Sequence, residues 1–290
     1  MIQPTVLIPA HRRIEATRRA LRSLREAGAE RLLLIDDEGT AGGRELAREF
    51  PGLEVLTTDR PVYWTGAIVL GVQRCLARGD ASVLFFNQDV TCVPDYFERL
   101  SETAARHPGA LVGSAVVYGH DPGTVWSAGG RMEWFGRGMR VLHHGAPLAS
   151  LPEQPYPVDW LFGMGTLVPS GVFARIGLPD AAMFPMSWGD TDFTLRARGA
   201  GLPVLVDPRA RLKHEVGAYD ARAAGPPSAE LYVSWLRDDR HNLSLSAHAE
   251  IWRRHGPRFL WPLSLALRVL TLLANYLRIR VLFPGEARGK

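Results

Sequence analysis

The chain has 290 residues, of which 46% are hydrophobic and 22% charged, so it can bury a substantial core and is not expected to be disordered. Its net charge of +4 is uneven, because residues 226–290 carry +5 and residues 1–225 carry −1. This charge gives no support to nucleic-acid binding by the main body, whereas the basic, apolar C-terminal region favours an anionic membrane surface or an acidic partner.

Cysteine usage and the N-terminus both indicate a reducing compartment. Cys75 and Cys92 are the two cysteines and show neither CxxC nor metal-ligand spacing, which is typical of ordinary buried thiols. A strand-like segment begins at Thr5 with no basic and apolar leader before it, so we expect no secretory signal and a cytoplasmic location.

Strand-like and helix-like segments alternate through the first half, which predicts a mostly parallel sheet covered by helices. The expected strands are 5–9, 32–35, 54–57 and 83–86. The expected helices are 14–27, 44–50, 67–78 and a fourth that has Pro94 at its first position and continues over 95–105. The loop after the first strand, residues 9–13, contains no glycine. This absence disfavours a dinucleotide-binding fold and a sugar nucleotidyltransferase.

The pattern changes between residues 110 and 157. A strand is expected at 112–117, and two glycine-rich pieces at 126–136 and 137–145 are typical of hairpin strands or a flexible loop. Strands at 166–169 and 204–207 follow, with helices at 170–176 and from about Asp190 to a C-cap at Gly199.

Carboxylates follow three of these segments. Asp36 and Asp37 end the second strand, and Asp89 follows the apolar strand Val83–Phe86. Ligands bind at the carboxyl edge of a parallel sheet, so these acids should meet there, although a loop aspartate near a helix start is the plainer interpretation of Asp89. Asp190 begins a helix, where an N-cap is at least as good an interpretation as catalysis.

His214 follows the last expected strand. A structural histidine is the plainer interpretation. If its side chain approaches Asp89, however, the two form a mixed nitrogen and oxygen site that a diphosphate could complete around Mg²⁺ or Mn²⁺.

Taken in chain order, six pieces resemble the inverting glycosyltransferases of family 2, which have the GT-A fold, and in particular the bacterial rhamnosyltransferase-like members. The pieces are PAHR at 9–12, LIDDEGT at 34–40, YWTGA at 63–67, FNQDV at 86–90, WGDTDF at 188–193, and His214. The resemblance implies an α/β fold of GT-A type at residues 1–225, with a mostly parallel central sheet flanked by helices. A C-terminal helical extension at residues 226–290 follows.

The resemblance also implies roles by position. Asp89 and His214 would bind a divalent cation, Mg²⁺ or Mn²⁺, and Asp190 would be the catalytic base. Nucleotide contacts would come from Pro9, His11, Arg12, Asp36, Asp37 and Asn87, and acceptor contacts from Trp64, Trp188 and Asp192. Which of Asp36 and Asp37 holds the nucleoside stays open, and packing explains either tryptophan as well as sugar stacking does.

Asn87 departs from the family pattern, because it stands where the first acid of the Asp-x-Asp motif is expected. An amide is a poorer cation ligand than a carboxylate, so fewer charged side chains would bind a metal ion here. The implied activity is metal-dependent inverting transfer of a sugar, first of all rhamnose from dTDP-rhamnose, to a lipid-linked or polysaccharide acceptor in cell-surface glycan synthesis. The alternative is a non-catalytic sugar-nucleotide-binding or scaffolding protein of the same pathway.

Residues 257–283 are apolar enough to suggest a membrane span, but Arg268 lies in the middle of the segment and Pro262 interrupts its start. One polar stripe recurs at helical spacing: Ser264, Arg268, Thr271, Asn275 and Arg278. We predict an amphipathic helix that lies on the inner face of the cell membrane or packs against a partner subunit, such as a second copy of the chain. A helix that covers the protein's own core is the competing interpretation.

Overall fold

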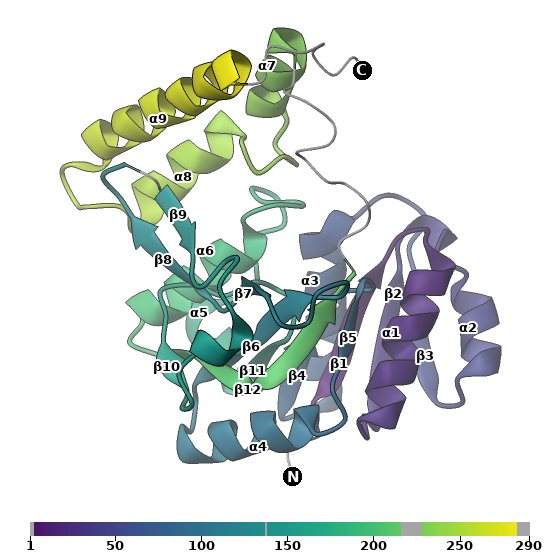
Figure 1. Cartoon of the computed structure of the whole chain (residues 1–290). Helices are drawn as coiled ribbons and strands as arrows, with labels where there is room; N and C mark the ends of the chain where they lie inside the picture. The colour runs from purple at the N-terminus through teal and green to yellow at the C-terminus, as the bar shows by residue number, and fades with distance from the viewer. Residues whose placement is uncertain (1–2, 137, 216–227, 283–290) are drawn as a thin grey trace.

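Apolar strands and amphipathic helices alternate at the start of the chain, as the sequence pattern predicts (Figure 1). The structure, a computed structural model, describes residues 3–136, 138–215 and 228–282. The first elements are β1 (Thr5–Ala10), α1 (Ile14–Glu26), β2 (Arg31–Asp36), the 3-10 turn η1 (Asp37–Gly39), α2 (Gly43–Glu49), β3 (Leu53–Thr57), α3 (Tyr63–Arg78), β4 (Ser82–Phe85), β5 (Val90–Cys92) and α4 (Tyr96–Arg106). Pro94 lies outside α4, which has Asp95 as its N-cap, so the prediction that it opens the helix is wrong.

The central sheet has the order β10-β12-β6-β11-β4-β1-β2-β3, with β5 and β7 joined at its side. Its remaining strands are β6 (Leu111–Tyr118), β7 (Val125–Ser127), β10 (Tyr156–Pro157), β11 (Thr166–Pro169) and β12 (Val204–His214). Most residue pairings are parallel, between β1 and β2, β2 and β3, β1 and β4, and β6 and β12. The antiparallel strand β11 joins the two parallel halves.

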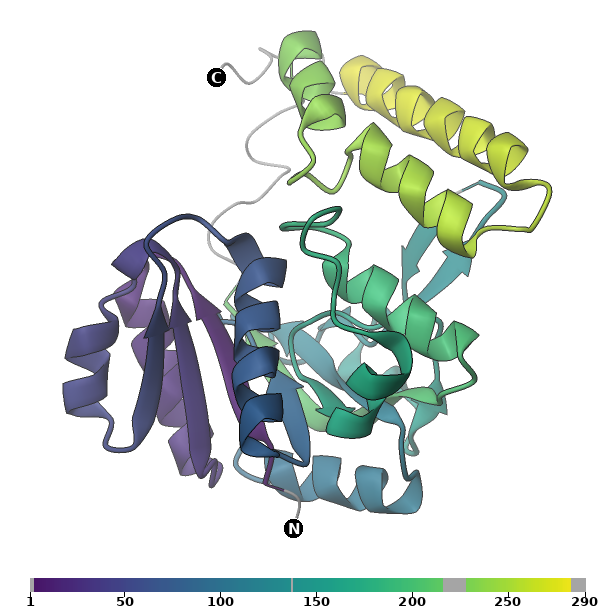
Figure 2. The same cartoon turned by 180° about the vertical axis from the view of Figure 1, so that it is seen from behind.

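Two apolar layers cover the sheet, because successive side chains of a strand point to opposite faces. In β1, Val6 and Ile8 pack with apolar residues of α1 and α4, whereas Leu7 packs with those of α3 and α6 (Gly189–Gly199). All three side chains are fully buried. The helix α5 (Ser170–Ile176) lies on the same side as α6 (Figure 2).

The segment between β6 and β11 contains a separate hairpin of β8 (Gly130–Glu133) and β9 (Gly138–Val141), followed by the 3-10 turn η2 (Leu148–Ser150). Of the two interpretations left open for the glycine-rich pieces, hairpin strands are therefore confirmed. β12 runs to His214, far beyond the expected residue 207, because it pairs with β6 on both sides of a register shift between Asp207 and Arg211. That irregularity accommodates Pro208 inside the strand.

Three helices follow: α7 (Ala229–Arg237), α8 (Leu245–His255) and α9 (Trp261–Leu282). They lie together on one side of the molecule, with α8 on the inner side of α9 (Figures 1 and 2). The expected boundary at residue 225 lies outside the described residues. Among the described helices, none is long and apolar enough to cross a membrane.

Candidate active site

The loop after β1 is fixed by Gln88, which follows β4. The Gln88 side chain donates to the His11 carbonyl at 3.2 Å and accepts the His11 N–H at 3.3 Å. Arg12 and Arg13 both have a φ of 54°, a left-handed conformation that is uncommon for residues other than glycine. The loop turns sharply without a glycine, and the hydrogen bonds of the Gln88 side chain hold it in place. They connect the loop after β1 to the end of the neighbouring strand β4.

Asp36 fastens the loop after β2. Its two carboxylate oxygens accept the N–H groups of Ala41 at 2.7 Å and Gly43 at 2.8 Å, and its side chain is buried. A Cβ on Gly43 would lie 2.7 Å from the carboxylate, so glycine is required for this approach. Both oxygens of Asp36 are thus used on the backbone, which gives this side chain a structural role.

Asp37 lies at the edge of a cavity. It accepts the N–H of Val62 at 2.9 Å and of Tyr63 at 3.2 Å, at the start of α3. The cavity has a volume of about 300 Å³, and its lining includes Pro9, His11, Asp37, Tyr63, Trp64 and Met186. This first cavity lies where the ends of β1 and β2 meet α3, and Arg12 and Asp36 are absent from its lining. Its size is at the lower end of the range for small-molecule sites.

A second cavity of about 410 Å³ shares Trp64 and Met186 with the first. Its lining also includes Asn87, Trp126, Phe162, Gly163, Trp188, Asp190 and Asn242. Trp64 Nε1 donates to Asn87 Oδ1 at 2.9 Å, which fixes the indole between the two cavities. The indole of Trp188 donates to the Asn242 carbonyl at 3.1 Å, so Trp188 joins this wall to the segment before α8.

Asp190 is in the first turn of α6, and its carboxylate lines the second cavity. The N-cap of this helix is Trp188, with a φ of 72°, so the interpretation of Asp190 as the N-cap is wrong. One oxygen of Asp190 accepts the Gly163 N–H at 2.7 Å and the other accepts the Thr191 N–H at 2.7 Å. Burial nevertheless raises the pKa of Asp190, as expected for a carboxylate that takes up a proton.

Gly189, just before this carboxylate, allows α6 to approach α3 closely. A Cβ at this position would overlap the hydroxyl of Thr65 in α3. Thr65 N–H in turn donates to the Pro185 carbonyl at 3.0 Å, in the segment that leads to α6. A small residue is thus required beside Asp190 to bring the two cavity walls together.

Asp89 and His214 form the pair anticipated from the sequence. The antiparallel pairing of β5 with β12 places His214 opposite Val90, and its Nε2 lies 3.7 Å from Asp89 Oδ2. Burial acts to raise the pKa of Asp89, but the hydrogen bond and charge of His214, with the charge of Arg13, hold it below its ordinary value. The His214 ring packs edge-on against Trp126 at a centroid distance of 4.8 Å, beside the second cavity.

The donor set of this pair is suited to one divalent cation. Nε2 of His214 is the ring nitrogen near Asp89, and a carboxylate with an imidazole suits Mn²⁺ or Mg²⁺ if phosphate oxygens and water complete the coordination. No cluster of three or more His, Cys, Asp and Glu side chains with metal-site geometry occurs in the part of the chain that the structure describes. Asn87 does not extend the pair, because its oxygen accepts from Trp64.

Comparison with known proteins identifies the family. Residues 5–161 match the family model described as glycosyl transferase family 2, which is more than half of the chain. The chain belongs to this family. A curated family relative, dTDP-rhamnosyl transferase RfbF of Shigella flexneri, is 22% identical over 156 residues, which are 54% of this chain and 50% of that protein.

The fold comparison agrees. The crystal structure of GalNAc-T7 with UDP, GalNAc and Mn²⁺ superposes with a TM-score of 0.63 at 14% identity and covers 95% of this chain and 54% of that chain. The predicted GT-A fold with a C-terminal helical extension is therefore confirmed, although the chain spans about half the length of either protein.

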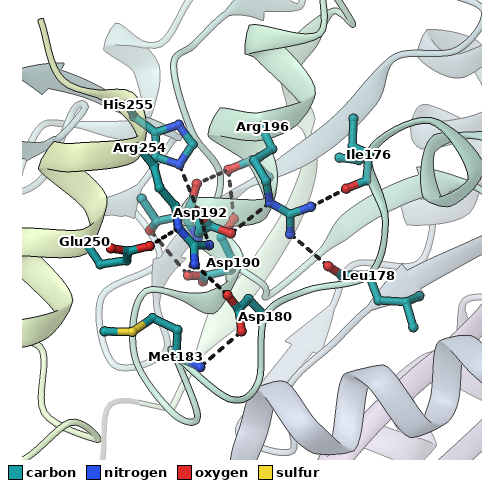
Figure 3. Close-up of polar contacts among 12 residues, drawn as sticks. Ile176, Leu178, Asp180, Met183, Asp190, Asp192, Arg196, Glu250, Arg254 and His255 are labelled. Atoms are coloured by element: carbon teal, nitrogen blue, oxygen red, sulfur yellow. Dashed lines mark hydrogen bonds and ion pairs between the residues drawn. The ribbon is translucent and has the colours of Figure 1, made fainter. Parts of the chain in front are cut away.

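Asp192 lines neither cavity and lies instead among the polar contacts between α6 and α8 (Figure 3). It is fully buried and accepts from Arg196 at 2.8 Å, from Arg254 at 3.2 Å and from His255 at 2.9 Å. Residues two apart on a helix lie on opposite sides, so Asp190 and Asp192 cannot face the same cavity. The expectation that Asp192 contacts the acceptor is therefore corrected: it joins α6 to α8.

Three contributors to the site were not singled out from the sequence. Gln88 holds the β1 loop, Arg13 places its guanidinium 3.3 Å from Asp89, and Asn242 lines the second cavity. The position of Gln88, inside the motif that ends in Asp89, was the available signal. Arg13 gave none, because its contact with Asp89 depends on a chain segment that is distant in sequence.

Proposed function

We propose that this glycosyltransferase transfers a sugar to an acceptor hydroxyl by a single displacement with inversion. The observation that carries the proposal is the carboxylate of Asp190, which lines the second cavity, and this cavity adjoins the first at Trp64 and Met186. The first donor to test is dTDP-rhamnose, in line with the rhamnosyl transferase relative. The proposed acceptor is lipid-linked or a polysaccharide, in the synthesis of cell-surface glycan.

In this proposal the two cavities hold different parts of the donor. The nucleoside occupies the first cavity, where Asp37 and His11 offer polar contacts. The diphosphate extends towards Asp89 and His214, and the sugar enters the second cavity beside Trp64 and Trp126. This arrangement leaves Asp190 on the wall that an acceptor hydroxyl would reach.

Asp190 acts as the general base. A sugar hydroxyl is a weak nucleophile at neutral pH, so the carboxylate takes its proton as the hydroxyl oxygen attacks the anomeric carbon. The bond from that carbon to the diphosphate oxygen breaks on the opposite face, and its electron pair leaves with the nucleoside diphosphate. The raised pKa of Asp190 makes it a better proton acceptor than an exposed aspartate.

Asp89 and His214 would hold a divalent cation, and Arg13 lies beside them. When bound, the cation would offset the negative charge that builds on the leaving diphosphate. The guanidinium of Arg13 supplies a fixed positive charge at the same place, which compensates in part for the neutral Asn87.

The decisive experiment compares Asp190→Asn with wild type. We measure release of dTDP from dTDP-rhamnose, with a bacterial membrane lipid extract as acceptor, and expect a loss of about 100-fold or more, typical of a missing general base. The shift in thermal midpoint caused by the donor should persist in the variant. Asp95→Asn, an exposed α4 residue outside both cavities, is the matched control and should transfer normally. Wild-type transfer by Asp190→Asn would refute the assignment.

A second candidate function is non-catalytic binding of a sugar nucleotide. It is favoured by Asn87, whose oxygen is used by Trp64, and by a metal pair of only two side chains. Under this alternative, wild type would bind the donor but would release no nucleoside diphosphate with any acceptor extract.

A further inference from the structure

The helix α9 presents apolar side chains outwards. Leu263 is 55% exposed, Leu270 60%, Leu277 62% and Val281 77%, and these positions recur at intervals of three or four residues together with the exposed Leu260, Leu267 and Ala274. At 100° per residue, such spacing places the six positions within α9 on one side of the helix, and Leu260 lies in the turn just before it. We call these seven side chains the outer stripe. Figures 1 and 2 show α9 at the outer edge of the molecule, with α8 on its inner side.

The inner side of α9 combines apolar residues, with Leu272 buried and Leu265 partly buried, with two polar ones. Ser264 is fully buried, accepts the indole N–H of Trp252 at 2.8 Å and donates to the Trp134 carbonyl. Arg268 lies against the β8–β9 hairpin, since a Cβ on Gly138 would come within 2.9 Å of its Nε. The residues of the predicted polar stripe therefore do not share one environment. Ser264 and Arg268 face the protein, whereas Asn275 and Arg278 are exposed.

An ordinary surface helix keeps polar residues on its outer side, whereas α9 is apolar on its outer side as well as on part of its inner side. Hydrogen bonds fix it, because Tyr232 of α7 donates to the Leu272 carbonyl at 3.0 Å and Ser264 bridges Trp252 and Trp134. The helix cannot roll its leucines inwards without breaking these buried contacts. Contiguous exposed apolar surface of this kind marks a docking site.

The charges around the outer stripe indicate what covers it. Residues 257–282 contain four arginines and no acidic residue. Arg278 and Arg280 are exposed and lie near opposite edges of the stripe, and Arg258 is exposed just before the helix. A second copy of the chain would bring arginines against arginines in either helix direction, with no acid on this helix to pair with them. An anionic phospholipid surface complements both the leucines and the arginines.

We propose that α9 lies flat in the headgroup region of an anionic membrane, with the outer stripe towards the acyl chains. Its 22 residues extend for about 33 Å along the membrane plane. The arginines at the stripe edges reach the phosphates while their stems cover apolar surface. This surface is distinct from both cavities, so membrane docking holds whatever sugar is transferred.

The test is sedimentation of the full chain with vesicles. Wild type should bind vesicles of phosphatidylglycerol mixed with phosphatidylcholine, and should bind pure phosphatidylcholine vesicles far more weakly. Leu270→Gln combined with Leu277→Gln should weaken binding at least about tenfold, because two of the most exposed leucines are lost. Each of Arg278→Gln and Arg280→Gln should weaken it about fivefold at low salt.

The control combines Leu76→Gln in α3 with Val233→Gln in α7, two exposed apolar side chains outside the outer stripe, and should bind as wild type does. Thermal midpoints of all variants, measured in parallel, show that the fold is kept. Failure of wild type to bind anionic vesicles would overturn the proposal, as would unchanged binding by the Leu270 and Leu277 variant. Light scattering without lipid gives a third outcome: a dimer that the same variant abolishes would assign the stripe to a second copy instead.

Discussion

Two opposing effects act on the pKa of Asp190: burial raises it, and backbone hydrogen bonds from Gly163 and Thr191 lower it. The effect of burial is the larger. Because burial disfavours the charged form, the pKa of this carboxyl is raised above its ordinary 3.8. A general base works only when ionised, so the transfer rate should fall as the pH drops through this raised pKa.

The measurement is the pH profile of kcat with saturating donor. The acid limb should lie above the pH at which an exposed aspartate titrates, and Asp95→Asn should leave it unchanged. A rate that stays flat down to about pH 4 would show that no carboxyl with a raised pKa acts as the base.

The pKa of Asp192 is shifted in the opposite direction to that of Asp190. Burial acts to raise its pKa, but the hydrogen bond of His255 and the charge and hydrogen bond of Arg196 hold the pKa below its ordinary value. A carboxyl with a lowered pKa stabilises the fold above its unfolded-state pKa, and this contribution disappears as the pH falls through the lowered value. Asp192→Asn should therefore cost about 3 kcal/mol at neutral pH, typical of breaking a buried charge network.

Urea unfolding of Asp192→Asn and wild type tests this prediction. The difference in the free energy of unfolding should be constant from neutral pH to about pH 5 and should shrink below about pH 4. Asp121→Asn, an exposed aspartate that pairs locally with Thr124, is the control and should change little. An equally stable Asp192→Asn would mean that the α6–α8 contact contributes nothing.

At the scale of elements, the segment before β11 and the helix α3 meet at Gly163. A Cβ at this residue would overlap the Trp64 ring, which forms the wall between the cavities. Gly163→Ala should displace Trp64, break its hydrogen bond to Asn87 and destabilise the fold by about 1–3 kcal/mol. Transfer should fall by more than donor binding, because the second cavity is distorted.

Gly171→Ala in α5 provides the matched comparison, since a Cβ there meets nothing within 4 Å and no unusual φ is required. It should be neutral or slightly stabilising, because alanine is the better helix former. Thermal midpoints and transfer rates of Gly163→Ala and Gly171→Ala test whether close packing at Gly163 holds Trp64. If the two alanine variants behave alike, Trp64 is not held by close packing at Gly163.

The elements of the first half could be predicted because their apolar periodicity is local. Pairing partners could not: β12 continues beyond Asp207 only because β6 lies beside it. The same limit applies to the site. Asp37, Asp190 and the Asp89–His214 pair follow strand ends or a helix start, which the sequence reveals. The inward direction of Asp192 and the hydrogen bond of Asn87 to Trp64 depend on α8 and α3, which are distant along the chain.

For the molecule as a whole, the C-terminal helices α7, α8 and α9 are packed into the rest of the protein near the second cavity. Asp192 binds Arg254 and His255 of α8, and Trp188 donates to Asn242 just before α8. The helix α6 and the Trp188 wall of the second cavity are therefore joined to α8 and the segment before it, and α8 packs against α9, which carries the outer stripe. We expect the C-terminal helices to orient the site towards the membrane as well as to stabilise it.

The proposed nucleotide-sugar site at the edge of the sheet depends on Asp37 and on a divalent cation. The most direct test is the thermal midpoint with dTDP-rhamnose, UDP-galactose and GDP-mannose, each with Mn²⁺ or with EDTA. A ligand that binds only the folded state raises the midpoint, so one donor should raise it with Mn²⁺ and much less with EDTA. Asp37→Asn should abolish the shift, whereas Asp59→Asn, an exposed neighbour outside the first cavity, should retain it. No shift with any donor, or an equal shift in Asp37→Asn, would contradict the claim.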